Sequence, residues 1–323
     1  MNGIYKLKRT FETYYRNYGT YMEAIVKFLT ALVLFLQING RIGKSSPLGN
    51  IFVELILALI CAVLPPNAML VFAVLTILAQ FASVSLAALA VGGGVLLIVV
   101  LLYFAFSRGE AWSLLLTLIG LCFHMPCIVP VAFGLKGTPL SAAGIAAGTV
   151  IYYVISAVVN GGQTQVQLAM AQSSEESIVE EVQHLLKAIL QEQEMILMLI
   201  VLLAVFAIVF FVRRMAMKHA WKVAIACGTL IYLVLMLTGY LMLELETGFL
   251  WILAGTVLSI LISVLLEQFF FALDYRHVEK LQFEDRDYYY YVQAIPKKNT
   301  RNETGKIDKK GREYHDGHET IHS

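Results

Sequence analysis

Long apolar runs constrain this chain more than any other feature of its sequence. Runs of about 17 to 25 residues lie at 22–38, 83–106, 140–159, 195–212, 220–243 and 249–273. A helix rises 1.5 Å per residue, so each run can cross a hydrocarbon layer of about 30 Å. Composition agrees, because 59% of the residues are hydrophobic and 15% are charged, against roughly half and a quarter in soluble domains. The sequence therefore predicts an all-α polytopic membrane protein with about six to eight membrane helices and the lipid bilayer as its main partner.

Charge, cysteines and motifs exclude several classes of function. The net charge is +1 and the basic residues are divided among short segments, so we expect no nucleic-acid partner. All four cysteines lie in apolar runs, where a thiol packs as a small hydrophobe, and we expect no disulfide. No His-Glu-x-x-His helix, Gly-x-Ser-x-Gly elbow or Walker loop occurs. We therefore predict no enzyme activity and no cofactor or metal.

Two units of the sequence contain short apolar runs interrupted by prolines. Each has a short run, a break and a second short run: Ile51–Leu64, Pro65-Pro66-Asn67 and Ala68–Ala82 in the first, and Ala111–Phe123, His124–Pro130 and Val131–Leu135 in the second. Apolar runs of roughly 10–14 residues favour re-entrant or buried helices over full crossings. A full span rich in small residues follows each unit, and Gly92-Gly93-Gly94 is expected to interrupt the first of these spans.

Basic residues orient the spans. The loop after residue 212 is rich in Arg and Lys, as is the tail beyond Asp274, so both are predicted to be cytoplasmic, together with the basic N-terminus. The acidic turn 244–248 and the polar stretch 163–193 then lie outside. An odd number of crossings must precede 163–193. Two re-entrant hairpins satisfy this condition, and so does one broken pair that crosses twice with the other pair re-entrant.

The chain therefore divides into six predicted parts. Residues 274–297 contain runs rich in Tyr, Val and Phe, which are typical of strands. Residues 161–194 carry an apolar stripe that is typical of an amphipathic helix. The parts are a cytoplasmic interfacial amphipathic helix (1–21), a membrane region with two broken-helix units (22–160), an extracytoplasmic amphipathic helix (161–194), a three-helix membrane region (195–273), a cytoplasmic β-hairpin (274–297) and a disordered basic tail (298–323).

The paired breaks supply the candidate functional residues. Broken helices at corresponding places in two repeats are the usual sequence pointer to a transporter's substrate site, although prolines also kink ordinary spans. Glu54 is a carboxylate within an apolar run. Such a residue is a functional candidate by default, and the alternative interpretation is that Glu54 lies near the membrane interface. His124 beside Cys122 and Cys127 offers metal-binding atoms, but the spacing is not that of a zinc site. The candidate substrate pathway comprises Glu54, Pro65, Pro66, Asn67, His124, Pro126 and Pro130.

Small residues recur every four positions in two of the spans. Gly144 and Gly148 form one such stripe, and Gly255, Ser259 and Ser263 form another. Small side chains allow helix backbones to approach closely within a membrane. We therefore expect both spans to have close protein neighbours.

The C-terminal part carries a resemblance to a known group of sequences. Its signature is Gln282-Phe283-Glu284-Asp285-x-x-Tyr288-Tyr289-Tyr290-Tyr291-Val292-x-Ala294-x-Pro296-Lys297, with Gly137-Thr138-Pro139-Leu140-Ser141 and Tyr152-Tyr153 as further shared segments. This pattern resembles uncharacterised multi-pass membrane proteins of anaerobic Gram-positive bacteria. The resemblance implies a bacterial plasma-membrane location and assigns no site residue.

Two hypotheses of function follow from the sequence. The leading one is a transporter-like component or permease subunit, which would need a separate ATPase subunit if it uses ATP, because the chain lacks a Walker loop. The alternative is a non-transporting scaffold or assembly subunit of a larger complex, and it rests on the extracytoplasmic helix and the hairpin tail.

Overall fold

The structure is a computed structural model that describes residues 2–42, 50–171, 178–215, 220–243, 249–270, 279–284 and 289–294. The acidic turn 244–248 and the tail 298–323 lie outside these residues. Two compact units are present, one formed by Asn17–Gln268 and the other by Met1–Arg16 with Phe269–Ser323.

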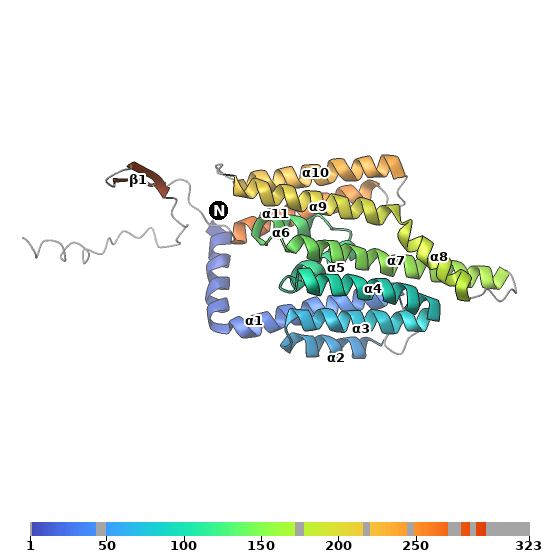
Figure 1. Cartoon of the computed structure of the whole chain (residues 1–323). Helices are drawn as coiled ribbons and strands as arrows, with labels where there is room; N and C mark the ends of the chain where they lie inside the picture. Colours follow the sequence, from blue (N-terminus) through green and yellow to red (C-terminus); the bar gives the residue numbers. More distant parts are fainter. Residues whose placement is uncertain are drawn as a thin grey trace, which may run out of the picture. The chain divides into compact units, whose positions relative to one another are not determined.

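The described part of the chain is almost entirely helical, and Figure 1 shows the helices of the larger unit lying side by side. The helices are α1 (Asn2–Ile42), α2 (Ile51–Val63), α3 (Pro66–Val84), α4 (Leu86–Phe106), α5 (Ala111–Cys122), α6 (Ile128–Lys136), α7 (Ser141–Ala171), α8 (Ile178–Leu190), α9 (Gln193–Arg214), α10 (Ala220–Leu243) and α11 (Phe249–Phe270). In the smaller unit, β1 (Glu279–Glu284) pairs antiparallel with β2 (Tyr289–Ala294), with Glu279 opposite Ala294 and Glu284 opposite Tyr289.

Six helices in the described residues are long and apolar enough to cross a membrane. They are Tyr18–Ile42, Pro66–Val84, Leu86–Phe106, Ser141–Gly161, Glu181–Arg214 and Ala220–Leu243, with Ile51–Val63, Ala111–Cys122 and Ala254–Leu265 as shorter apolar helices. In α1 the apolar part begins at Tyr18, whose backbone is non-helical at φ −128° and ψ 26°. The prediction of an all-α polytopic protein is confirmed at this level.

The boundary between α3 and α4 differs from the prediction. The run Ala68–Ala82 was expected to be a short helix, but α3 has 19 residues and continues to Val84. Ser85 ends α3 and caps α4, because its hydroxyl accepts a hydrogen bond from the Ala88 backbone N–H at 2.9 Å. A capping serine thus divides one long apolar stretch into two helices that are each long enough to span.

The glycine triplet does not interrupt α4, so this expectation was wrong. A Cβ atom on Gly92 would lie 2.8 Å from the Phe81 ring, and one on Gly93 would lie 2.9 Å from Leu78. Both neighbours belong to α3. The triplet therefore lets α3 and α4 pack closely, and α4 remains helical throughout.

Helices α5 and α6 form a hairpin whose two ends lie together. Glu110, just before α5, accepts hydrogen bonds from the Thr138 and Ser141 hydroxyls at 2.8 Å, and both of these residues follow α6. The Ser107 hydroxyl at the end of α4 donates to the Leu140 carbonyl at 2.9 Å. The end of α4, the two ends of the hairpin and the start of α7 therefore lie at one end of the bundle.

The predicted close packing of small residues is confirmed. Gly144 of α7 lies against Ser113 of α5, and a Cβ atom on Gly148 would lie 2.7 Å from the Leu114 carbonyl oxygen. Gly255 of α11 lies directly against the His124 carbonyl oxygen. Each glycine meets backbone or a short side chain of the α5–α6 hairpin, which is therefore enclosed by α7 and α11.

The apolar stripe of α8 is used within the bundle. Leu185 and Ile189 are 2% and 4% exposed, and α8 packs against α4 and α7. A second apolar cluster joins α6 to α9 and α10 and includes Cys127, Val205 and Tyr232.

Candidate functional site

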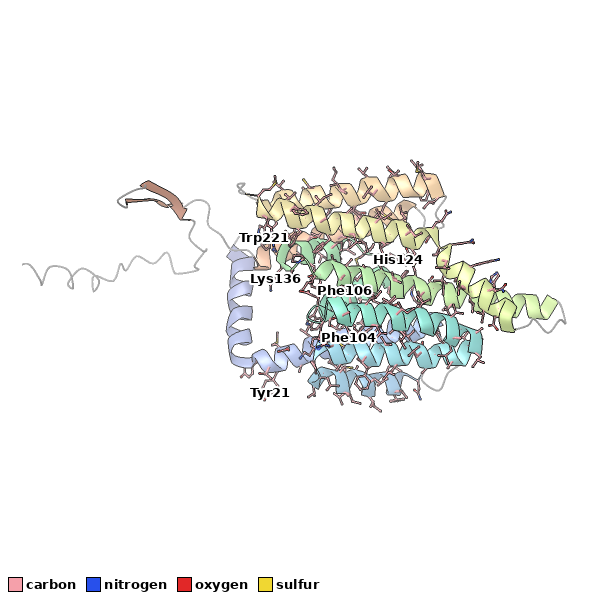
Figure 2. All side chains as sticks on the ribbon, viewed as in Figure 1. Tyr21, Phe104, Phe106, His124, Lys136 and Trp221 are labelled. Atoms are coloured by element: carbon pink, nitrogen blue, oxygen red, sulfur yellow. The ribbon has the colours of Figure 1, made fainter. Side chains whose placement is uncertain are left out.

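Basic residues gather at the end of the bundle where the hairpin begins and finishes. Helix α9 ends with Arg213 and Arg214, and α6 ends with Lys136. Arg213 donates hydrogen bonds to the Leu135 and Gly137 carbonyls, which fixes the last turn of α9 against the end of α6. We call this the basic end. Figure 2 shows Lys136 and Trp221 towards it and His124 further along the bundle.

The tip of the α5–α6 hairpin turns inside the bundle. His124 has a positive φ of 58°, a conformation that few residues other than glycine adopt. The Met125 backbone N–H donates to the Gly120 carbonyl at 2.8 Å and closes the turn. Helix α5 has 12 residues, so the tip lies about 18 Å from the basic end. That depth is slightly more than half of a hydrocarbon layer of about 30 Å.

A polar cluster lies beside this tip. The Arg41 guanidinium donates a hydrogen bond to the Tyr152 hydroxyl at 2.8 Å and lies 4.4 Å from the centre of the same ring. The Cys122 thiol at the end of α5 also lies within interaction distance of Arg41. Glu194 in the first turn of α9 is close enough to interact electrostatically with Tyr152. These four residues, from α1, α5, α7 and α9, form the Arg41 site.

The Arg41 site has the composition of a recognition site more than that of a catalytic one. A guanidinium offers five fixed N–H donors, and Tyr152 uses at least one of them. The remaining donors suit a carboxylate or phosphate group, while Glu194 provides a nearby acceptor for a cationic group. Charged side chains within membrane bundles are expensive and commonly mark substrate or ion pathways.

The other face of the tip is apolar and closed. Cys127 is fully buried in the cluster with α9 and α10, whereas Cys122 is half-buried on the side of Arg41. The two thiols therefore face different neighbours. Among the residues that the structure describes, no three His, Cys, Asp or Glu side chains form a metal-binding group.

The predicted pathway residues lie in three places. Pro65, Pro66 and Asn67 form the connection between α2 and α3, where the Asn67 side chain accepts a hydrogen bond from the Tyr103 hydroxyl near the end of α4 at 3.3 Å. This connection is at the basic end. His124, Pro126 and Pro130 lie at the hairpin tip, with both prolines buried and His124 exposed.

Glu54 lies apart from the tip and from the α2–α3 connection. It is in the first turn of α2, at the end of the bundle opposite the basic end, and is 2% exposed. Neither of its carboxylate oxygens accepts a hydrogen bond of normal geometry. Its side chain is therefore surrounded by protein.

Sequence reasoning missed Arg41 and Tyr152. Arg41 follows the first apolar run by only three residues, and this position is typical of a residue at the membrane surface. Its partner Tyr152 lies 111 residues further along the chain. The tyrosine pair Tyr152-Tyr153 inside a small-residue span was the one signal that could have directed attention to this site.

The fold and the site define a multi-pass, all-α membrane protein with a charged cluster beside a buried hairpin tip. Comparison of the chain with protein-family models, with curated proteins and with solved structures finds no match.

Proposed function

We propose that this chain is a transporter-like membrane component or permease subunit in a bacterial plasma membrane, with a pathway that passes the Arg41 site. The observation that supports it most is the α5–α6 hairpin, which enters and leaves at the basic end and places its tip beside Arg41. Broken helices beside charged groups near the bilayer midplane are typical of transporter binding sites.

The proposed topology follows from helix lengths and charge. Basic loops lie in the cytoplasm, so the basic end faces inward and both termini are cytoplasmic. Helix α3 is long enough to span, whereas α2 is a shorter apolar helix of 13 residues. We propose that the two helices together cross twice, with α2 as the shorter crossing. Five crossings, α1, α2, α3, α4 and α7, then precede the extracytoplasmic α8. The α5–α6 hairpin is re-entrant in this arrangement, since its second arm has only nine residues.

A substrate pathway accounts for the chemistry at the tip. Non-helical backbone persists inside a bilayer where protein or a water-filled cavity surrounds it. Cys127 and the buried prolines pack against protein, while Cys122 and Arg41 are half-buried. Arg41 near the outer end of α1 and Glu194 at the start of α9 flank the way in from outside. Water and substrate would therefore enter from the extracytoplasmic side.

The scaffold alternative requires a surface that is free for a partner. The extracytoplasmic helix α8 was one of its two supports, beside the hairpin tail, but the stripe that would dock a partner packs on α4 and α7. This packing favours the transporter-like function over the scaffold.

Thiol labelling tests the pathway with a matched control in the same hairpin. Two variants each keep a single native cysteine, Cys122 or Cys127, five positions apart. Cells are treated with a charged maleimide that does not cross membranes, and the remaining thiols are counted after denaturation. Cys122 is expected to react from outside and Cys127 to stay unmodified, because Cys127 is fully buried. A Cys122 thiol that is protected from both sides of the membrane until denaturation would rule out a water-filled pathway at the tip.

A further inference from the structure

Two buried polar side chains, one in α2 and one in α3, lack the well-formed hydrogen bonds that burial normally requires. Glu54 is 2% exposed and Gln80 is 0% exposed. Both the oxygen and the nitrogen of the Gln80 amide lack a hydrogen-bond partner within the described structure, and neither Glu54 carboxylate oxygen accepts a hydrogen bond of normal geometry there. Buried polar groups are satisfied in the great majority of native structures, so each exception requires an explanation.

The topology places these side chains at the same end of the bundle. Helices α2 and α3 run antiparallel from the Pro65-Pro66 connection, so the start of α2 lies beside the end of α3. Glu54 is three residues from the start of α2 and Gln80 is four from the end of α3, which puts both within about 6 Å of that end along the helix axes. Both belong to the buried faces of their helices.

A third polar side chain joins them from α1. Asn39 is three residues before the end of α1, at the same level of the bundle, and its amide approaches the Glu54 carboxylate and interacts with it. No Lys, Arg or His side chain in the described residues pairs with this carboxylate. One negative charge and two neutral amides therefore lie at the same level of α1, α2 and α3.

The chemistry of this cluster is that of a hard-cation site. Carboxylate and amide oxygens are the ligands that small hard cations prefer in proteins. A single carboxylate balances a single positive charge, which favours a monovalent ion over Ca²⁺ or Mg²⁺. A proton bound to Glu54 would occupy one carboxylate oxygen and donate one hydrogen bond to a single acceptor. A coordinated metal ion would instead contact several of these oxygens at once.

We propose that Glu54, Gln80 and Asn39 bind Na⁺ between α1, α2 and α3, with Glu54 supplying the charge and the two amides supplying neutral oxygen ligands. The proposal goes beyond the transporter-like function and does not depend on it. The sodium site also lies on different helices from the Cys122 thiol, so either proposal can fail while the other stands.

Thermal unfolding of the purified full-length protein in detergent tests the site. NaCl replaces choline chloride at constant ionic strength, and tryptophan fluorescence reports the melting temperature. A ligand that binds only the folded state raises the melting temperature in proportion to its occupancy. Wild type is expected to show a saturable rise with Na⁺ and a smaller rise with K⁺.

Three variants identify the ligands. Glu54→Gln keeps the side-chain shape but removes the charge, so the Na⁺ response should be lost. Gln80→Leu removes one neutral ligand and should raise the half-saturating Na⁺ concentration about tenfold or more. Glu23→Gln is the control, because Glu23 is an exposed carboxylate on the same helix as Asn39 and pairs with Lys27 at 2.7 Å. Its response should match wild type.

Several outcomes would overturn the proposal. One is an equal Na⁺ response in wild type and Glu54→Gln. Another is a melting temperature that follows pH and not Na⁺, since Glu54 would then be a proton site. If Glu54→Gln does not fold, equilibrium binding of radioactive sodium to wild type and Gln80→Leu decides the question, and equal binding by the two proteins would reject the site.

Discussion

A close approach between the backbones of α5 and α7 is open to a direct test at Gly148. This residue is buried where α7 crosses α5, and a Cβ atom there would lie 2.7 Å from the Leu114 carbonyl oxygen and 3.0 Å from the Thr117 Cβ. Ordinary contacts of this kind are several tenths of an ångström longer. Because the Leu114 oxygen belongs to the α5 backbone, Gly148→Ala must push the two helices apart or bend one of them.

The matched control is Gly94→Ala in α4, where no atom lies within 4 Å of the added methyl group. Both substitutions gain the same helix propensity, about 1 kcal/mol for alanine over glycine. Only Gly148→Ala also suffers overpacking, which costs about 1–3 kcal/mol in well-packed interiors. The difference between the two variants therefore isolates the packing cost, and the immovable carbonyl at Gly148 favours the upper half of that range.

Melting temperatures in detergent, followed by tryptophan fluorescence, provide the measurement. A change of 1 kcal/mol shifts the melting temperature by about 2–4 °C in domains of roughly this size. Gly148→Ala should therefore melt several degrees below Gly94→Ala, and Gly94→Ala should melt at or above wild type. Equal melting temperatures for the two variants would refute the close α5–α7 approach and with it the enclosure of the hairpin.

Two further predictions concern the basic end. Glu110→Ala removes the acceptor of the Thr138 and Ser141 hydroxyls. It should destabilise the protein by about 1–2 kcal/mol, which is measured as a lower melting temperature. An unchanged melting temperature would show that other contacts hold the hairpin ends. Tyr103→Phe leaves the ring buried but removes the hydroxyl that donates to Asn67. It should lower the free energy of unfolding by about 0.5–1.5 kcal/mol, measured in the same assay. A much larger loss would mean that packing of the ring, and not this hydrogen bond, had changed.

Local chemistry made much of this fold readable from the sequence. Length and hydropathy predict the spans because lipid leaves the backbone no hydrogen-bond partner except itself. The glycine and serine stripes at Gly144, Gly148, Gly255, Ser259 and Ser263 predict close packing because small residues leave room for a neighbouring backbone. In the structure, Ser259 and Ser263 are buried and each of the three glycines faces the α5–α6 hairpin.

Features that depend on a distant partner could not be read in the same way. The Gly92-Gly93-Gly94 triplet carries a low helix propensity, but its role is set by Phe81 and Leu78 on the neighbouring helix, which fill the space that side chains would occupy. The role of Arg41 depends likewise on Tyr152 of α7. No pattern within a single run distinguishes an arginine that reaches the membrane surface from one that turns back into the bundle.

The two proline breaks differ in the length of the helix that follows each of them, which the sequence pattern did not take into account. Both look alike as a proline between short apolar runs, yet Pro65-Pro66 lies in a connection at the basic end and Pro126 at a buried tip. The difference is the length of the second arm, 19 residues in α3 against nine in α6. An arm of 19 residues reaches about 28 Å and can span, whereas an arm of nine reaches about 13 Å and cannot. In the proposed topology the first break therefore lies at a membrane surface and the second lies inside the membrane. In that topology the depth of each break follows from the distance between the proline and the residue that ends the next helix, Ser85 for α3 and Gly137 for α6.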